Sequence, residues 1–352
     1  MDQPVTIVQI AKESGVSIAT VSRVMNGTAP VSEQTRRRVN EVIQRHRYTP
    51  NAFARSLINR QSMTIGIIMP DISNPYFSAM FSEFEAAAHE ANYSVFLCNT
   101  SFSAARMADK TPRELEYFQM MLDKKVDGVL IVGGQADLLE VSEAYRSALQ
   151  HLSAAVPVVV LGSRIPGVEC LFIQRETGRG VFSAVSYLAS LGHRRIAFVG
   201  GEDGVGITEA RLNAYMDALH ALGLPRERAL VALSNYYTPD GYKAMNDLLK
   251  NGAPFTALLA MNDNIALGAF RALADAGLRV PQDVSVISCD QFYSAEYLVP
   301  RLTSVDQHNE QFGRFIINAL LGAMRGVQEN VVLTFTPELV IRESCAPAPA
   351  SR

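Results

Sequence analysis

Residues 6–15 carry apolar side chains at the spacing of one face of a helix. Ile7, Ile10 and Ala11 form this stripe, and the small Ala11 leaves room for a second helix to cross closely. Thr6 precedes the stripe, where its hydroxyl can accept a hydrogen bond from a free amide of the first turn. Gly15 follows it and can adopt the left-handed conformation that ends many helices. The pattern predicts a short helix that ends in a tight turn.

A second helix is predicted to begin directly after Ser17. Val21, Val24 and Met25 repeat at helical spacing and would face inward against the first helix. The other side of this helix carries small or polar residues and one arginine: Ile18, Ala19, Thr20, Ser22 and Arg23. Two helices joined in this way are typical of the helix-turn-helix, whose second helix enters the DNA major groove. There an arginine can bind guanine through two hydrogen bonds, and a small apolar side chain can contact a thymine methyl group.

A third helix is expected after Ser32, with Val39, Val42 and Ile43 facing inward. Its first half carries three consecutive arginines, residues 36–38. Positive charge in the first half of a helix opposes the helix dipole, so DNA phosphates explain these arginines better than helix stability does. The alternative is a small helical hairpin with a merely solvated face, as many bare helix-turn-helix patterns are. The arginines favour DNA binding.

Residues 45–63 form a polar connector in which Asn51, directly after a proline, can cap a new helix. A short helix is predicted over residues 52–59, and a helix of this length is marginal alone in water. The DNA minor groove can stabilise it, with Leu57 wedged between base pairs and Arg55 on a phosphate. From composition alone, a plain polar linker is the simpler interpretation.

Beyond residue 63, short β-rich runs alternate with longer amphipathic stretches. This alternation indicates doubly wound parallel sheets, and the chain length fits two sheets better than one. The predicted strands are Ile65 to Met69, Val95 to Cys98, Val129 to Val132, Val158 to Leu161, Ile196 to Val199, Ala257 to Ala260 and Val284 to Cys289. The chain is expected to change subdomain near residues 172–177 and to return near Phe292 and Arg325.

Charge separates the two parts of the chain. The 352 residues have a formal net charge of −3, yet residues 1–60 hold nine Lys and Arg against four Asp and Glu. The first sixty residues therefore carry +5 and the remainder −8. This split fits a DNA-binding head on a body that does not attract polyanions.

The four cysteines lie far apart in the sequence and form no C-x-x-C pair, so neither a disulfide framework nor a zinc site is indicated. The N-terminus lacks the basic-then-apolar build of a signal peptide, and no run approaches the roughly 18 apolar residues of a membrane span. We expect a cytoplasmic protein that uses no metal and no cofactor.

Polar and aromatic residues follow several of the predicted strands. In open α/β sheets, ligands bind beyond the carboxyl ends of the strands. Carboxylates, amides, one arginine and aromatic rings suit a polyhydroxylated ligand, whose hydroxyls donate and accept while its C–H face stacks on rings. The residues at these positions are Asp71, Tyr76, Phe77, Asn99, Arg211, Tyr236, Asn262 and Asp290. Any one of them can instead be a helix cap or an ordinary polar loop residue.

Three motifs resemble the head and hinge of the lactose/galactose repressor (LacI/GalR) family. They are VSIATVSRVMNG at residues 16–27, RYTPN at residues 47–51 and ARSL at residues 54–57. The resemblance implies that the connector helix folds only on operator DNA and that Leu57 intercalates at the centre of a palindromic site. The DNA-binding residues that we predict are Thr6, Ser17, Ile18, Ala19, Thr20, Ser22, Arg23, Asn26, Asn51, Ala54, Arg55 and Leu57.

The resemblance extends over residues 5–342 and implies a periplasmic-binding-protein fold of two subdomains joined by three crossovers. It also implies that Arg211, in an R-L-x-x-[FY] pattern, and Asp290 contact the effector. Further residues that align with common contacts in the family are Tyr76, Phe77, Tyr236 and Asn262.

Three departures from the family pattern concern the ligand. Gly162 stands where sugar-binding members often carry an aspartate, and Ser288 and Cys289 replace a glycine-aromatic pair. Residues 102–110 form a longer insert. An added arginine, Arg164, would suit a phosphorylated or acidic ligand, and we therefore include it among the predicted ligand-binding residues.

The expected fold is α/β, with an N-terminal all-α helix-turn-helix head and a two-subdomain, periplasmic-binding-protein-like body of doubly wound parallel sheets. The expected boundaries are residues 1–50 for the head, 51–62 for the hinge helix and linker, 63–342 for the effector-binding and dimerisation domain (N-subdomain 63–172 and 292–325, C-subdomain 173–291 and 326–342), and 343–352 for a disordered tail. Prolines in that tail forbid the leucine-heptad helix that joins some family members into tetramers, so a homodimer is expected.

The sequence thus predicts a dimeric transcription regulator, a repressor of carbohydrate-metabolism genes, whose partners are double-stranded operator DNA and a small sugar or sugar derivative. A solute-binding or sensor protein with the same body fold is the alternative, which the basic head disfavours. An enzyme is a second alternative, but the chain has no phosphate-binding glycine loop with its lysine, no G-x-S-x-G and no histidine-rich metal spacing.

Overall fold

The computed structural model describes residues 5–26, 29–46, 48, 61–101, 113–327 and 336–349. The chain forms two compact units, residues 1–62 and residues 63–352, and each is described by itself. No helix among these residues is long and apolar enough to cross a membrane.

The first unit contains the three helices that the sequence predicts: α1 (Ile7–Ser14), α2 (Ile18–Asn26) and α3 (Glu33–Arg45). Thr6 caps α1 by accepting a hydrogen bond from the amide of Gln9 at 3.4 Å. Gly15 ends the helix at a φ of +64°, a conformation that costs little only for glycine. The core consists of five apolar side chains from the three helices: Ile10, Ala11, Val21, Val39 and Val42.

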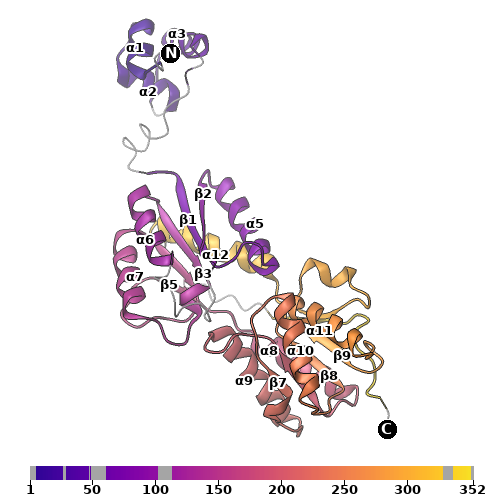
Figure 1. Cartoon of the computed structure of the whole chain (residues 1–352). Coiled ribbons are helices and arrows are strands. Elements are labelled where there is room, and N and C mark those ends of the chain that lie inside the picture. Colours follow the sequence, from indigo (N-terminus) through magenta and orange to yellow (C-terminus); the bar gives the residue numbers. More distant parts are fainter. Residues whose placement is uncertain are drawn as a thin grey trace. The chain divides into compact units, whose positions relative to one another are not determined.

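The second unit begins with a sheet of five parallel strands in the order β2-β1-β3-β4-β5. Their bounds are β1 (Thr64–Met69), β2 (Ser94–Asn99), β3 (Gly128–Val132), β4 (Val158–Leu161) and β5 (Leu171–Ile173). Helices α5 (Pro75–Glu90) and α12 (Asn309–Met324) pack against one face of this sheet, and α6 (Arg113–Lys124) and α7 (Glu143–Ala155) pack against the other (Figure 1). Both faces are thus covered, which explains why β3 is apolar at every position after its glycine.

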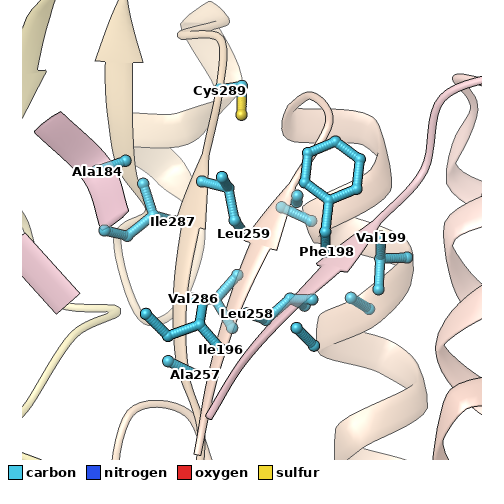
Figure 2. Packing of buried hydrophobic residues seen from close by; sticks show 14 of the residues in the cluster. Ala184, Ile196, Phe198, Val199, Ala257, Leu258, Leu259, Val286, Ile287 and Cys289 are labelled. Atoms are coloured by element: carbon cyan, nitrogen blue, oxygen red, sulfur yellow. The ribbon is translucent and has the colours of Figure 1, made fainter. Parts of the chain in front are cut away.

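The second sheet has six strands in the order β11-β10-β9-β8-β6-β7, and only β11 runs antiparallel to its neighbour. Its strands are β6 (Ile196–Val199), β7 (Val231–Ala232), β8 (Ala257–Ala260), β9 (Ser285–Ser288), β10 (Thr303–Asp306) and β11 (Glu338–Val340). The helices around it are α8 (Gly178–Ser190), α9 (Gly206–Ala221), α10 (Thr238–Lys250) and α11 (Asp263–Asp275). Figure 2 shows the centre of its core, where Phe198, Leu259 and Ile287 come from three adjacent strands.

Within the described parts of the chain, three 3-10 turns join these elements: η2 (Gly134–Asp137), η3 (Arg228–Leu230) and η4 (Tyr293–Tyr297). The turn η2 follows β3 directly, and η4 lies between β9 and β10.

The chain crosses between the sheets later than the sequence predicts. The expected return near Phe292 is wrong, because β10 still belongs to the second sheet, and the chain reaches α12 only after Asp306. The expected tail also differs, because residues 343–349 are packed against the second sheet. Ser344 is fully buried, where its hydroxyl accepts from the amide of Thr303 at 2.8 Å and donates to the carbonyl of Val286 at 2.6 Å.

Helices α10 and α11 cross at a point where Gly241 allows close contact. A Cβ atom added there would lie 2.6 Å from the carbonyl oxygen of Ile265. We predict that Gly241→Ala lowers the free energy of unfolding by about 1 to 3 kcal/mol, because overpacking outweighs the better helix propensity of alanine.

Gly322→Ala in α12 is the matched control, because its added Cβ would meet its nearest neighbour at an ordinary 3.6 Å. Urea unfolding of both variants measures the difference. Equal stability of the two variants would show that the α10–α11 crossing does not need a glycine.

Candidate functional site

The exposed face of α2 carries the side chains that the sequence predicts to read DNA. Ile18, Ala19 and Arg23 are exposed, while Val21 on the opposite side is fully buried. Ser17 begins the helix by accepting a hydrogen bond from the amide of Thr20 at 3.1 Å, and the two hydroxyls lie 2.9 Å apart. The face is therefore held by the core behind it and by its own cap.

The other predicted DNA-binding residues divide into two groups. Thr6 is exposed and Ser22 is half-buried, and both belong to the described part of the head. Asn51, Ala54, Arg55 and Leu57 lie outside the described residues. The backbone of Asn26 belongs to α2, but its side chain also lies outside the description. The three arginines of α3, residues 36–38, are exposed, as a phosphate-binding role requires.

A cavity of about 490 Å³ lies in the second unit and is lined by residues that follow strands of both sheets. Four aromatic rings contribute to its wall: Tyr76, Phe77, Tyr236 and Tyr237. Six of the nine predicted ligand-binding residues line it: Tyr76, Phe77, Arg211, Tyr236, Asn262 and Asp290. The structure thus brings together residues that are far apart in the sequence.

Local capping explains where the aromatic residues lie. Asn74 caps α5 by accepting from the amide of Tyr76 at 3.1 Å, so Tyr76 and Phe77 fall in the first helical turn and meet edge to face at 5.0 Å. Asn262 caps α11 in the same manner and also donates to the carbonyl of Tyr236 at 3.1 Å. Two helix N-termini therefore fix opposite walls of the pocket.

Arg211 and Asp290 form a buried ion pair at the C-terminal end of the second sheet. The guanidinium makes two hydrogen bonds to the carboxylate, at 2.7 and 3.0 Å, and a third to the carbonyl of Met261 at 2.6 Å. Burial opposes the charge of Arg211, but Asp290 outweighs it and raises the pKa of this arginine. The guanidinium and the carboxylate neutralise each other in this buried pair.

Three predicted ligand-binding residues do not line the pocket. Arg164 is exposed and lies outside the lining, so the expectation that it favours an acidic ligand has no support in the geometry. Asn99 ends β2 away from the pocket, where its carbonyl accepts from Tyr117. Asp71 accepts a hydrogen bond from the hydroxyl of Tyr237 at 2.6 Å.

Asp71 follows β1 of the first sheet and Tyr237 follows β7 of the second, so this hydrogen bond joins the two subdomains across the cleft that forms the pocket. A second link is a backbone bridge between Leu138 and Val205, in which the amide of Leu139 also donates to the carbonyl of Gly204 at 3.0 Å. These contacts tie the two subdomains together, and a rigid-body opening must break them.

Charged residues that the sequence did not single out also line the pocket: Asp137, Arg175, Glu176 and Glu202. Arg175 donates to Asn309 at 2.5 Å and to the carbonyl of Gln307 at 2.8 Å, which joins the first crossover to the second. Its guanidinium packs 4.0 Å from the ring centre of Phe312. The sequence gives no signal for Arg175, because its role depends on a segment more than 130 residues away.

Among the residues that the structure describes, no group of three or more His, Cys, Asp or Glu side chains is placed to hold a metal ion. A helix-turn-helix head in one chain with a pocket between two parallel sheets defines the class of ligand-responsive transcription regulators.

Comparison with known proteins places the chain within that class. A profile described as "Bacterial regulatory proteins, lacI family" matches residues 6–51, and one described as "Periplasmic binding protein-like domain" matches residues 185–345. The transcriptional repressor PurR of Haemophilus influenzae (strain PittEE) is 32% identical over 345 residues, which cover 96% of this chain and 98% of that protein.

Two solved structures are similar over nearly the whole chain. The Lac repressor dimer bound to operator and the anti-inducer ONPF has a TM-score of 0.84 at 25% identity, over 98% of this chain and 100% of that one. The complex of the regulator CelR with cellobiose has a TM-score of 0.69 at 29% identity, over 97% and 99%. The chain belongs to the lacI family of bacterial regulatory proteins, and it is a transcriptional regulator rather than an enzyme.

The hydrogen bond between Tyr237 and Asp71 gives a test of the closed cleft. We predict that Tyr237→Phe increases hydrogen–deuterium exchange in residues 71–74 and 235–237, because the subdomains then separate more often. Tyr242→Phe is the matched control, because the Tyr242 hydroxyl binds Asp275 on the exposed surface of α10 and α11. Equal exchange in both variants would show that the link does not hold the cleft closed.

Proposed function

We propose that this protein is a homodimeric repressor that binds a pseudo-palindromic operator and is controlled by a small sugar-like effector in its pocket. Its place of action is the cytoplasm, and its targets are genes of carbohydrate metabolism. The observation that carries this proposal is the presence, in one chain, of an exposed helix-turn-helix face and a pocket lined by residues that follow strands of two sheets.

The exposed residues of α2 support binding to base edges. Ile18 and Ala19 lie in the first turn of the helix, and Arg23 lies on the next turn, about where a recognition helix meets the major groove. The exposed arginines 36–38 would bind the phosphate backbone. Asn51, Ala54, Arg55 and Leu57 would complete the site from the minor groove.

An exposed apolar ridge in the second unit supports a homodimer. Tyr293, Tyr297 and Val299 are exposed by 84%, 66% and 94%, which is unusual for side chains of this size and polarity. A groove beside them is lined by Ser78 and Ala79 of α5 together with residues of η4. A second copy of the chain would cover this ridge, as a two-fold symmetric operator requires. The similar Lac repressor structure is that of a dimer.

The lining of the pocket supports a sugar-like effector. Its aromatic rings offer faces for C–H groups, and Asn262, Asp290 and Arg211 offer donors and acceptors for hydroxyls. The cavity volume of about 490 Å³ accommodates a mono- or disaccharide. The similar CelR structure contains cellobiose.

Effector binding would act on DNA by changing the closure of the cleft. The segment that leads to the head is continuous with β1 of the first sheet, so a change in the separation of the two sheets would shift this segment relative to the second sheet. Folding of the connector on DNA and binding of DNA are one equilibrium, so a small shift can change operator binding by about 1 to 3 kcal/mol.

Selection from a pool of random duplex DNA tests the proposal. The protein should enrich one pseudo-palindromic sequence. Arg23→Ala should relax the preference at one position of each half-site and weaken binding by about 1 to 3 kcal/mol, because a bidentate contact to a base is lost.

Arg37→Ala is the comparison variant, because an exposed arginine on α3 is expected to contact phosphate and to weaken binding on all sequences equally. If the folded protein enriches no sequence, the proposal is refuted. If Arg23→Ala weakens binding equally on all DNA sequences, Arg23 contacts the phosphate backbone and not a base.

A further inference from the structure

Asp137 is an acidic residue of the pocket that forms no ion pair with any of the residues that the structure describes. It ends the turn η2, and its Oδ2 atom lies close to the bare Cα of Gly133, next to the ring of Phe77. A Cβ atom on Gly133 would meet Asp137 Oδ2, Phe77 Cζ and Pro70 Cγ at 3.2 to 3.3 Å. The glycine thus lets the carboxylate and the aromatic ring stand side by side in the wall of the pocket.

The turn that carries Asp137 is held from three sides. The carboxylate of Glu114 accepts hydrogen bonds from the amide and the side chain of Gln135, at 3.1 and 3.2 Å. Gly162 lets the turn lie against β4, since a Cβ there would come within 2.8 Å of the carbonyl of Ala136. The bridge between Leu138 and Val205 fixes the next residue. Asp137 is therefore placed before any ligand arrives.

Asp137 accepts no hydrogen bond from the residues that the structure describes, and burial raises its pKa to about 7. Two of the three other acids in the lining have partners that the structure identifies. Asp290 is paired with Arg211, and Glu176 accepts from the amide of Gly178 at 2.7 Å. The carboxylate of Asp137 therefore lines the pocket with its hydrogen-bond acceptor capacity unused by the described residues.

Only one of the two arginines in the pocket lining is paired with a carboxylate among the described residues. Arg211 is neutralised by Asp290 and offers an anion little, whereas Arg175 is hydrogen-bonded to the neutral side chain of Asn309 and to the carbonyl of Gln307 and keeps its positive charge. An anionic group placed beside Asp137 would meet the carboxylate of Asp137 in a partly desolvated site.

We propose that Asp137 determines the specificity of the effector site and accepts a hydrogen bond from a hydroxyl or amino group of an uncharged or amino sugar, against phosphorylated and acidic sugars. The assignment rests on the proposed effector-binding role of the pocket.

Matched compounds test this assignment. Isothermal titration calorimetry would compare glucose, glucosamine, glucose 6-phosphate and gluconate, then ribose and ribose 5-phosphate, and finally cellobiose. We expect at least one uncharged or amino sugar to bind, and each acidic counterpart to bind at least tenfold more weakly. We expect Asp137→Asn to lower the affinity of that sugar at least tenfold.

Glu140→Gln is the matched control, because it removes the same charge from an exposed position three residues further along the chain. It should leave the affinity unchanged. Thermal unfolding of both variants checks that they fold, and Asp137→Ser serves as a second variant if the asparagine variant does not. Binding of only the acidic compounds, binding of no compound, or equal affinities in the Asp137 and Glu140 variants would overturn the assignment.

The pH dependence of binding separates Asp137 from its neighbours. A ligand donor favours the ionised carboxylate, so the affinity should rise between about pH 6 and pH 8. The titratable groups that face Asp137 are Glu114, Tyr76, Tyr145 and Tyr236. The three tyrosines have raised pKa values and stay neutral over this range, whereas Glu114 has a pKa of about 7. The rise should persist in Glu114→Gln and disappear in Asp137→Asn; the reverse result would overturn the assignment.

These outcomes are distinct from failure of the proposed function. If the protein enriches no operator, the proposed function fails whatever the sugars do. If it enriches an operator and a sugar changes this binding, but Asp137→Asn does not alter that sugar's affinity, only the role of Asp137 is wrong.

Discussion

The direction of the chain in the two sheets is the constraint on which the rest of the body depends. The central strands of each sheet are parallel, so their carboxyl ends lie at one edge, and the loops that follow them gather there. Residues after β1, β3 and β4 meet residues after β6, β8 and β9 around one cavity. Because the chain crosses between the sheets three times, the two walls of the pocket are joined by covalent connections, the arrangement in which hinge motion between subdomains occurs.

Among the charged residues that line the pocket, Arg211 and Asp290 neutralise each other, whereas Arg175 and Asp137 have no partner of opposite charge among the described residues. The pair of Arg211 and Asp290 is buried with bidentate geometry, and removing either partner would leave an uncompensated charge. Arg175 joins two crossovers rather than facing a carboxylate. Asp137 remains without a hydrogen-bond donor among the described residues, which makes the site ready for a ligand that donates.

Periodicity and strand-end arguments predicted the three head helices, seven of the strands and six residues that line the pocket. Three of the four strands that were missed, β5, β7 and β11, have only two or three residues, too few for a period to show. The fourth, β10, has four residues, but its sequence TSVD is mostly polar and gives no apolar run. Asp137 was missed because it lies in a 3-10 turn beyond two glycines, where no pattern fixes the direction of a side chain. Arg164 was included for its charge, and only the three-dimensional structure shows that it is exposed.

The central claim is that the pocket and the DNA-binding head are coupled. The most direct measurement is the affinity of the enriched operator with and without saturating effector, together with the affinity of that effector with and without operator. The two ratios must be equal by thermodynamic linkage, and we predict a common factor between about 5 and 150. An operator affinity that is the same with the pocket empty and occupied would contradict the account.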